Sequence, residues 1–124
     1  MRTKPCLTLE DCRRITAAAE GEAKKNNWNV TICILDDGGH VLLLTRMDGA
    51  SPVTAQIATQ KGRSAAIARR STKVGEDRIA AGRVALVKMP GLPVQGECVG
   101  GIGVSGVQSH EDEQVGSAGL AVLK

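Results

Sequence analysis

The sequence predicts a single α+β domain in which helices flank an antiparallel sheet. The chain has 124 residues, which is enough for one hydrophobic core and too few for two independent ones. Residues 37–39, Asp-Gly-Gly, form a tight-turn sequence between two β-rich runs, which therefore pair most simply as a hairpin. Helical patterns stand before this hairpin, directly after it and at the end of the chain. We therefore expect one domain over residues 1–124.

The first helix is expected from Thr8 to about Lys25. Thr8 is a suitable N-cap, and Asp11, three residues later, can reach back to it as in a capping box. Residues near helical spacing then give the helix one modest apolar face: Cys12, Ile15, Ala19 and Ala23. The β-rich runs 30–35 and 41–44 follow, and they are the predicted strands of the hairpin.

The second helix is expected to begin at Ser51-Pro52, because serine caps free helix amides and proline suits the first helical position. It should continue to about Arg69. The remaining expected elements are a short helix over 72–81, a strand over 84–88, a loop at 90–93, a turn and the last strands within 95–105, and a final helix over 109–123. Ser109 and Asp112 make a second capping-box pattern, and acids there also favour the positive end of the helix dipole.

The core of this domain must be built almost without aromatic residues. Trp28 is the only aromatic residue in the chain, which has no phenylalanine and no tyrosine. Aliphatic side chains packed around glycine bury less area per residue than a core that contains aromatic rings. Burial against copies of the same chain would compensate for this. We therefore expect a homo-oligomer, with an even number of subunits because two-fold pairs are the commonest closed arrangement.

Charge and cysteine content narrow the expected partners and compartment. The formal net charge is +3, and the basic residues are scattered rather than gathered in a stripe, so nucleic acid is not an expected partner. No apolar run reaches membrane-spanning length, and no secretory signal is visible. We therefore expect a cytoplasmic protein that does not bind a membrane. Its four cysteines, Cys6, Cys12, Cys33 and Cys98, are expected to be free thiols rather than zinc ligands.

The most informative stretch is the glycine-rich run at 100–106, Gly-Gly-Ile-Gly-Val-Ser-Gly. Glycines repeated within a strand-like run indicate that another backbone or a ligand approaches closely. The run therefore marks either a packed joint with a helix or the wall of a pocket, in which Gly101 and Gly103 are candidate ligand contacts. It lacks the strand, G-x-G-x-x-G and helix order that defines a dinucleotide site.

Together with the segments 36–40, Asp-Asp-Gly-Gly-His, and 46–50, Arg-Met-Asp-Gly-Ala, this run resembles the GlcG/HbpS family, which is also similar to the PduO C-terminal domain. The resemblance extends from about Leu7 to Leu123. It implies a profilin-like fold with a sheet of about five strands, and it implies a small oligomeric protein of a kind that in some members binds haem. The chain has no Glu-x-x-Glu pattern of the sort that some iron-binding relatives use, which argues against surface iron binding.

Four ionisable side chains are candidates for the pocket, and each has a structural alternative. Arg46 either forms a salt bridge with Asp48 at the strand-to-helix corner, or holds an anionic group such as a carboxylate or a haem propionate. Lys61 matches a lysine that family members carry, and either completes a cationic pocket with Arg46 or is a solvated helix residue. His40 either serves as a metal or haem-iron ligand, or follows a simple turn in which Asp36 bonds to backbone amides.

Two hypotheses about function follow. In the first, the protein is a homo-oligomeric small-molecule binding protein whose pocket takes haem, another tetrapyrrole or a small anionic metabolite. In the second, it is an enzyme or accessory factor acting on a small oxygenated metabolite, since family members occur beside glycolate, glycerol or diol pathways. Asp48, Lys61 or His40 would then be the acid or base. The sequence shows no recognisable triad, metal motif or cofactor loop, which favours the binding hypothesis.

Overall fold

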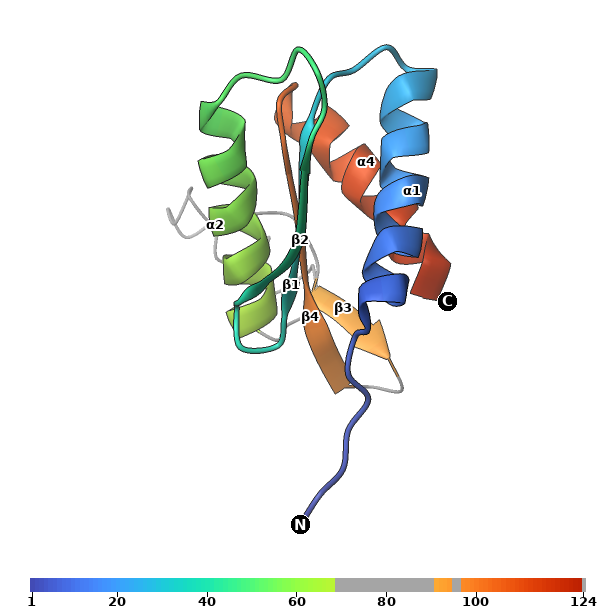
Figure 1. Ribbon diagram of the computed structural model, residues 1–124, viewed down its shortest axis with the longest axis vertical. Coiled ribbons are helices and arrows are strands. Elements are labelled where there is room, and N and C mark those ends of the chain that lie inside the picture. The colour runs from blue at the N-terminus through green and yellow to red at the C-terminus, as the bar shows by residue number, and fades with distance from the viewer. Residues whose placement is uncertain (69–90, 95–96, 124) are drawn as a thin grey trace.

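The computed structural model describes residues 1–68, 91–94 and 97–123. Within them, one antiparallel sheet lies between helices on both of its faces (Figure 1). The helices are α1 (Leu9–Lys25), α2 (Val53–Ala68) and α4 (Ser109–Leu120), and the short 3-10 helix η1 (Ala121–Leu123) follows α4. The strands are β1 (Thr31–Asp36), β2 (Val41–Arg46), β3 (Gly91–Val94) and β4 (Glu97–Ser105). The predicted α+β fold class is confirmed.

The strands lie in the order β2-β1-β4-β3, and all neighbours are antiparallel. Both β2 and β4 pair along β1, so that Thr31 lies opposite Arg46 on one side and Ser105 on the other. Among the described residues, β3 pairs with β4 from Gly91 opposite Gly101 to Val94 opposite Glu97. α2 covers β4 and β1 on one face, and α1 and α4 pack together on the other face (Figure 1).

One sequence expectation about the second half of the chain differs from the structure. The loop expected at 90–93 is wrong, because Gly91–Val94 form strand β3. Proline is tolerated there because β3 lies at the edge of the described sheet, and the register shifts between Leu92 and Pro93. The helix expected over 72–81 and the strand expected over 84–88 lie outside the described residues.

The start of α1 confirms the predicted capping box. The Asp11 N–H donates to Thr8 Oγ1 at 3.1 Å, and the Thr8 N–H donates to Asp11 Oδ2 at 2.9 Å. The start of α4 differs from the prediction by one residue. Gln108, not Ser109, is the N-cap, and its N–H donates to Glu111 Oε1 at 3.2 Å. Asp112 is therefore free to turn inward, away from the helix end.

The two faces of the sheet are packed in different ways. On the α1 and α4 face, large aliphatic side chains interdigitate: Ile15, Ile32, Ile34, Ile102, Val104 and Val115, all fully buried. On the α2 face, the buried hydrophobic cluster is smaller and consists of Cys33, Leu35 and Ala58. Because side chains alternate along a strand, Ile102 and Val104 of β4 point to the first face, whereas Gly101 and Gly103 lie on the second.

The glycines of β4 allow α2 to approach the sheet closely. A Cβ atom added to Gly101 would lie 2.2 Å from the carbonyl oxygen of Gly62, and one added to Gly103 would lie 1.9 Å from the carbonyl oxygen of Ala58. Both oxygens belong to the backbone of α2. The helix backbone therefore occupies the space that a side chain would need. Of the two alternatives for this run, the structure shows the packed joint.

No helix among the described residues is long and apolar enough to cross a membrane.

Candidate functional site

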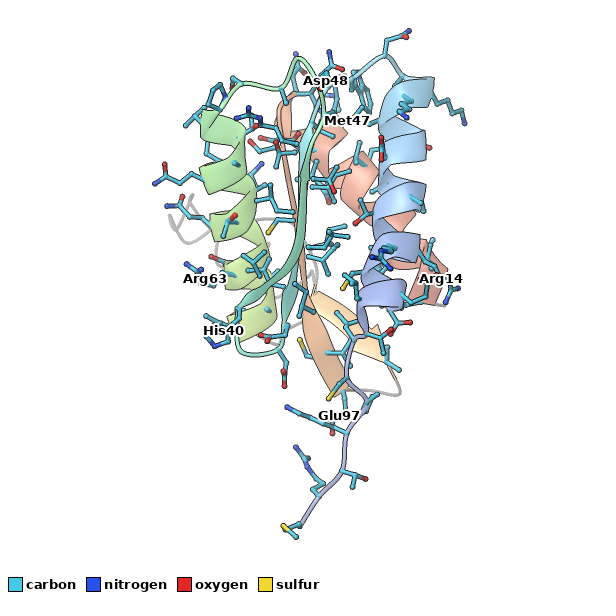
Figure 2. The ribbon with its side chains drawn as sticks, in the orientation of Figure 1. Arg14, His40, Met47, Asp48, Arg63 and Glu97 are labelled. Atoms are coloured by element: carbon cyan, nitrogen blue, oxygen red, sulfur yellow. The ribbon has the colours of Figure 1, made fainter. Side chains whose placement is uncertain are left out.

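The residues expected to form one pocket lie apart in the structure. His40 precedes β2 at one end of the sheet, whereas Arg46 ends β2 at the other, with Asp48 just beyond it. Figure 2 shows His40 at the lower end of the hairpin of β1 and β2, and Asp48 at the upper end of the molecule. Gly101 and Gly103 have no room for a ligand on their α2 side, because the helix backbone fills it. The expected pocket of these residues is therefore not assembled within one chain.

The hairpin turn before β2 is organised by Asp36. Its Oδ1 accepts the N–H groups of Gly38 and His40, each at 2.9 Å. The Asp36 N–H also donates to the carbonyl oxygen of His40 at 2.8 Å. The interpretation of this segment as a simple turn thus accounts for Asp36. The His40 side chain is exposed. Among the described residues, no three His, Cys, Asp or Glu side chains gather in a way that could hold a metal ion.

The Arg46 to Ala50 corner carries exposed charges. Arg46 and Asp48 are both exposed, and within residues 1–68, 91–94 and 97–123 neither takes part in an ion pair. Gly49 has a φ of +88°, which favours glycine, and a Cβ there would lie 2.9 Å from Asn29 Nδ2. The corner is thus fixed by its backbone and by packing against Asn29, not by the Arg46–Asp48 salt bridge considered above.

Lys61 is not a solvated helix residue, which was the alternative interpretation. Its Nζ donates to the carbonyl oxygen of Val104 at 2.9 Å and to Asp112 Oδ2 at 3.0 Å. The Asp112 side chain is 4% exposed and that of Lys61 21%. The other oxygen of Asp112 accepts the N–H of Val107 at 3.2 Å. This ion pair joins α2, the end of β4 and the start of α4.

Burial is the main cause that raises the pKa of Asp112 above its ordinary value, and the hydrogen bond and charge of Lys61 oppose this effect. Asp112 thus supplies the counter-charge of Lys61, the residue expected to complete a cationic pocket with Arg46. Considered within the sequence alone, Asp112 has an ordinary explanation as an acid at a helix start. Its partner lies 51 residues away along the chain, so no local pattern could reveal the pair.

An apolar cleft lies where the N-terminal segment, α1, β3, β4 and η1 meet. It has a volume of about 260 Å³. Its walls carry mostly aliphatic side chains, with a thiol, a carboxylate and a guanidinium among them: Pro5, Cys6, Leu7, Asp11, Arg14, Val94, Val99, Val122 and Leu123. Binding pockets for organic molecules typically combine apolar walls with a few polar groups, in volumes of about 300–1,000 Å³. The cleft has this character at the lower limit of size.

Three polar side chains give the apolar cleft its chemistry. Asp11 is committed to the capping box, and its bonds to Thr8 are the main cause that lowers the pKa of its carboxyl. Arg14 is exposed and forms no ion pair within the part of the chain that the structure describes. Cys6 is an exposed free thiol. The cleft therefore offers a cation and a soft sulfur ligand beside an apolar surface.

Sequence reasoning did not find this cleft. Cys6 and Arg14 stand near the start of the chain, whereas Val122 and Leu123 stand at its end. Only the packing of α1 against α4 and η1 brings these segments together. The one local signal was that Arg14 lies one turn inside a helix whose start was correctly predicted. That signal alone does not distinguish a cleft residue from a solvated one.

The sheet with its glycine-lined joint and the helices on its two faces define the class of this protein, a small α+β domain of known architecture. Comparison with solved structures identifies the same fold in HbpS of Streptomyces reticuli, determined as a double mutant, with a TM-score of 0.82 and 27% identity over 100% of this chain and 91% of that one. The PduOC:heme complex has a TM-score of 0.81 at 22% identity over 97% and 96% of the two chains, which shows the shared fold.

Residues 7–121 match the family described as "Haem degrading protein HbpS-like", and the chain belongs to this family. It is also 44% identical over 114 residues to Protein GlcG of Escherichia coli, a match that covers 85% of each chain. The resemblance inferred from the glycine run, the hairpin turn and the 46–50 corner is thus confirmed.

Proposed function

We propose that this protein binds a small anionic organic molecule, with haem or another tetrapyrrole as the leading candidate, and that it does so as a homo-oligomer. The observation that carries this proposal is the apolar cleft beside Cys6 and Arg14. The family description names haem, and the related PduOC structure is a haem complex. Both support a tetrapyrrole as the first ligand to test.

The residues of the cleft fit the chemistry of haem. Aliphatic walls suit the apolar body of the macrocycle, the Arg14 guanidinium suits a propionate, and a cysteine thiolate is an established class of haem-iron ligand. The volume, about 260 Å³, suits one edge of a macrocycle or the whole of a smaller molecule. A bound haem would supply an iron centre there. The chain itself would anchor the carboxylate through Arg14 and exclude water with its valines and leucines.

A haem titration tests this proposal. The parent protein is expected to shift the Soret band of added haem. The haem complex of Cys6→Ser is expected to have its Soret band at a different position from that of the parent complex, because the sulfur ligand is lost. Arg14→Gln should weaken binding about tenfold with little change in band position, because it removes only the contact to the anionic group. Arg13→Gln is the matched control, since Arg13 pairs with Glu10 at 3.9 Å and does not line the cleft.

His40→Ala distinguishes the cleft from the ligand expected from the sequence. It should leave the spectrum unchanged if the iron lies in the cleft. A band that moves in His40→Ala and stays in Cys6→Ser would put the iron at the hairpin turn instead. Absence of any Soret shift in the parent protein would remove tetrapyrroles as ligands.

Self-association is supported by the position of the exposed apolar side chains. Among the described residues, the large exposed hydrophobic side chains other than Met1 and Leu9 all lie on β2 and α2: Val41, Leu42, Leu44, Val53 and Ile67. Leu44 lies opposite Cys33, which packs against Ala58 of α2, so Leu42 and Leu44 share the α2 side of the sheet. Yet α2 covers β4 and β1 and barely reaches β2. This leaves an apolar surface beside the helix.

A second copy of the chain is the occupant that this surface fits. β2 lies at the edge of the described sheet, and an edge strand presents backbone N–H and C=O groups for pairing. The same edge of a second copy offers the complementary groups in a two-fold antiparallel arrangement, in which the leucines of one β2 meet those of the other. Two-fold pairing of this kind gives an even-numbered oligomer.

Light scattering tests the proposed interface. The parent protein is expected at a multiple of 12.9 kDa. Leu44→Glu should reduce that mass, because a charge placed in the paired surface is costly to bury. Leu9→Glu changes an equally apolar and exposed side chain on α1 and should leave the mass unchanged. A parent protein that runs as a monomer at micromolar concentration would contradict the proposal.

A further inference from the structure

A second cleft lies at the opposite end of α1 from the apolar one. It has a volume of about 300 Å³ and is lined by Lys24, Asn27, Trp28, Asn29 and Met47. At about 30 Å³ for each water molecule, this is room for a molecule of about ten heavy atoms. In Figure 2, the labelled Met47 lies at this end of the molecule, and the labelled Arg14 lies on the part of α1 nearer the first cleft. We refer to it below as the Trp28 cleft.

The backbone of the Trp28 cleft is fixed by the way α1 ends. The Trp28 N–H donates to the carbonyl oxygen of Ala23 at 2.8 Å, and the Asn27 N–H donates to that of Lys24 at 3.1 Å. This is the pair of bonds of a Schellman motif, and Asn27 has the left-handed φ of +60° that the motif requires. The opposite wall is fixed as well, because the Met47 N–H donates to the carbonyl oxygen of Val30 at 3.0 Å. The backbone of the site therefore needs little ordering before a ligand binds.

The polar side chains of the Trp28 cleft are available for a ligand. Neighbouring Asn26 uses its amide to bond Glu22, whereas the amides of Asn27 and Asn29 have no hydrogen-bond partner among the described residues. Lys24 pairs with Glu20 at 3.1 Å, but the Lys24 side chain is 67% exposed and its ammonium group has three N–H donors. No acidic side chain lines the cleft.

These groups define the chemical class of the ligand. The Lys24 ammonium suits a carboxylate, and each asparagine amide both donates and accepts, as a hydroxyl group does. Trp28 and Met47 pack against the core with one side and offer apolar surface with the other. We propose that the Trp28 cleft binds a small hydroxycarboxylate, a carboxylic acid that also carries hydroxyl groups. This inference does not depend on haem binding, because the two clefts share no residue.

The only tryptophan of the chain reports directly on occupancy of this cleft. Titration with glycerate and with erythronate is expected to change Trp28 fluorescence with a dissociation constant in the millimolar range or below. Glycerol, which lacks the charge, and acetate, which lacks the hydroxyl groups, should each bind about tenfold more weakly or worse. Equal responses to glycerate, glycerol and acetate would overturn the proposal, as would no response to glycerate and erythronate.

Two variants with matched controls place the ligand. Lys24→Gln should weaken glycerate binding about tenfold, whereas Lys25→Gln, one residue further along α1 and outside the cleft, should not. Asn27→Gly removes one amide and keeps the backbone, because glycine readily adopts a φ of +60°. It should weaken binding and leave the circular dichroism spectrum unchanged. Equal affinities of the two lysine variants, or full affinity in Asn27→Gly, would overturn the assignment.

Discussion

Replacing Gly103 with alanine is expected to lower the free energy of unfolding by about 3 kcal/mol, the upper part of the usual range for overpacking. The added Cβ would lie 1.9 Å from the carbonyl oxygen of Ala58 and 2.5 Å from the backbone nitrogen of Gly62. Both atoms belong to the backbone of α2, so no side-chain rotation can relieve the contact. The helix must move away from the sheet, and valine in place of alanine would displace it further.

Gly21→Ala is the matched control for this substitution. Gly21 lies within α1, and a Cβ added there meets nothing within 4 Å. Alanine at an open helix position should raise the free energy of unfolding by about 0.5–1 kcal/mol, because it restricts the unfolded chain. Chemical denaturation of the parent protein and both variants measures the two effects, which have opposite signs. A Gly103→Ala variant as stable as the parent would show that α2 does not rest on β4.

The second large effect is expected at the Lys61–Asp112 ion pair. Lys61→Met keeps an unbranched side chain that is one atom shorter and removes the charge, and it leaves the buried Asp112 carboxylate with the Val107 N–H as its remaining bond. Removing one partner of a buried ion pair lowers the free energy of unfolding by about 3–5 kcal/mol. Lys61 is partly exposed, so we expect a loss near the lower end, about 3 kcal/mol at neutral pH.

The loss in Lys61→Met should depend on pH with a definite sign. Burial raises the pKa of Asp112 above its ordinary value of 3.8, so the folded protein holds this proton more tightly than the unfolded chain does. The contribution of Asp112 to the free energy of unfolding therefore falls as the pH rises from about 3.8 through the raised pKa, and it is recovered on acidification. Without Lys61 the pKa rises further, so the difference from the parent should be largest at neutral pH and should shrink in mild acid.

A double variant separates charge burial from lost packing. Asp112→Asn keeps an oxygen that can accept the Val107 N–H but removes the charge, so Lys61→Met combined with Asp112→Asn should recover part of the stability at neutral pH. Denaturation curves at several pH values test this, and each variant is compared with the parent so that other titrations cancel. A Lys61→Met deficit of the same size at every pH would contradict a charged Asp112 as its cause.

Sequence reasoning succeeded where the decisive interactions are local. The capping box of α1 needs only Thr8 and Asp11, three residues apart, and the hairpin needs only the turn at 37–39 between two β-rich runs. The alternation of glycine with isoleucine and valine in β4 also indicated close approach by something. The pattern did not identify the contacting group, because glycines in a strand indicate a close contact but not whether a helix or a ligand makes it.

The sequence by itself determined the fold class, the family and most element boundaries, because caps, turns and side-chain alternation act over a few residues. The tertiary structure decided the rest. It buried Asp112 against Lys61, placed the backbone of α2 against Gly101 and Gly103, and closed a cleft between Cys6 and Leu123. Each of these outcomes depends on how helices pack across the sheet. That packing is set by contacts between distant residues, which local spacing does not encode.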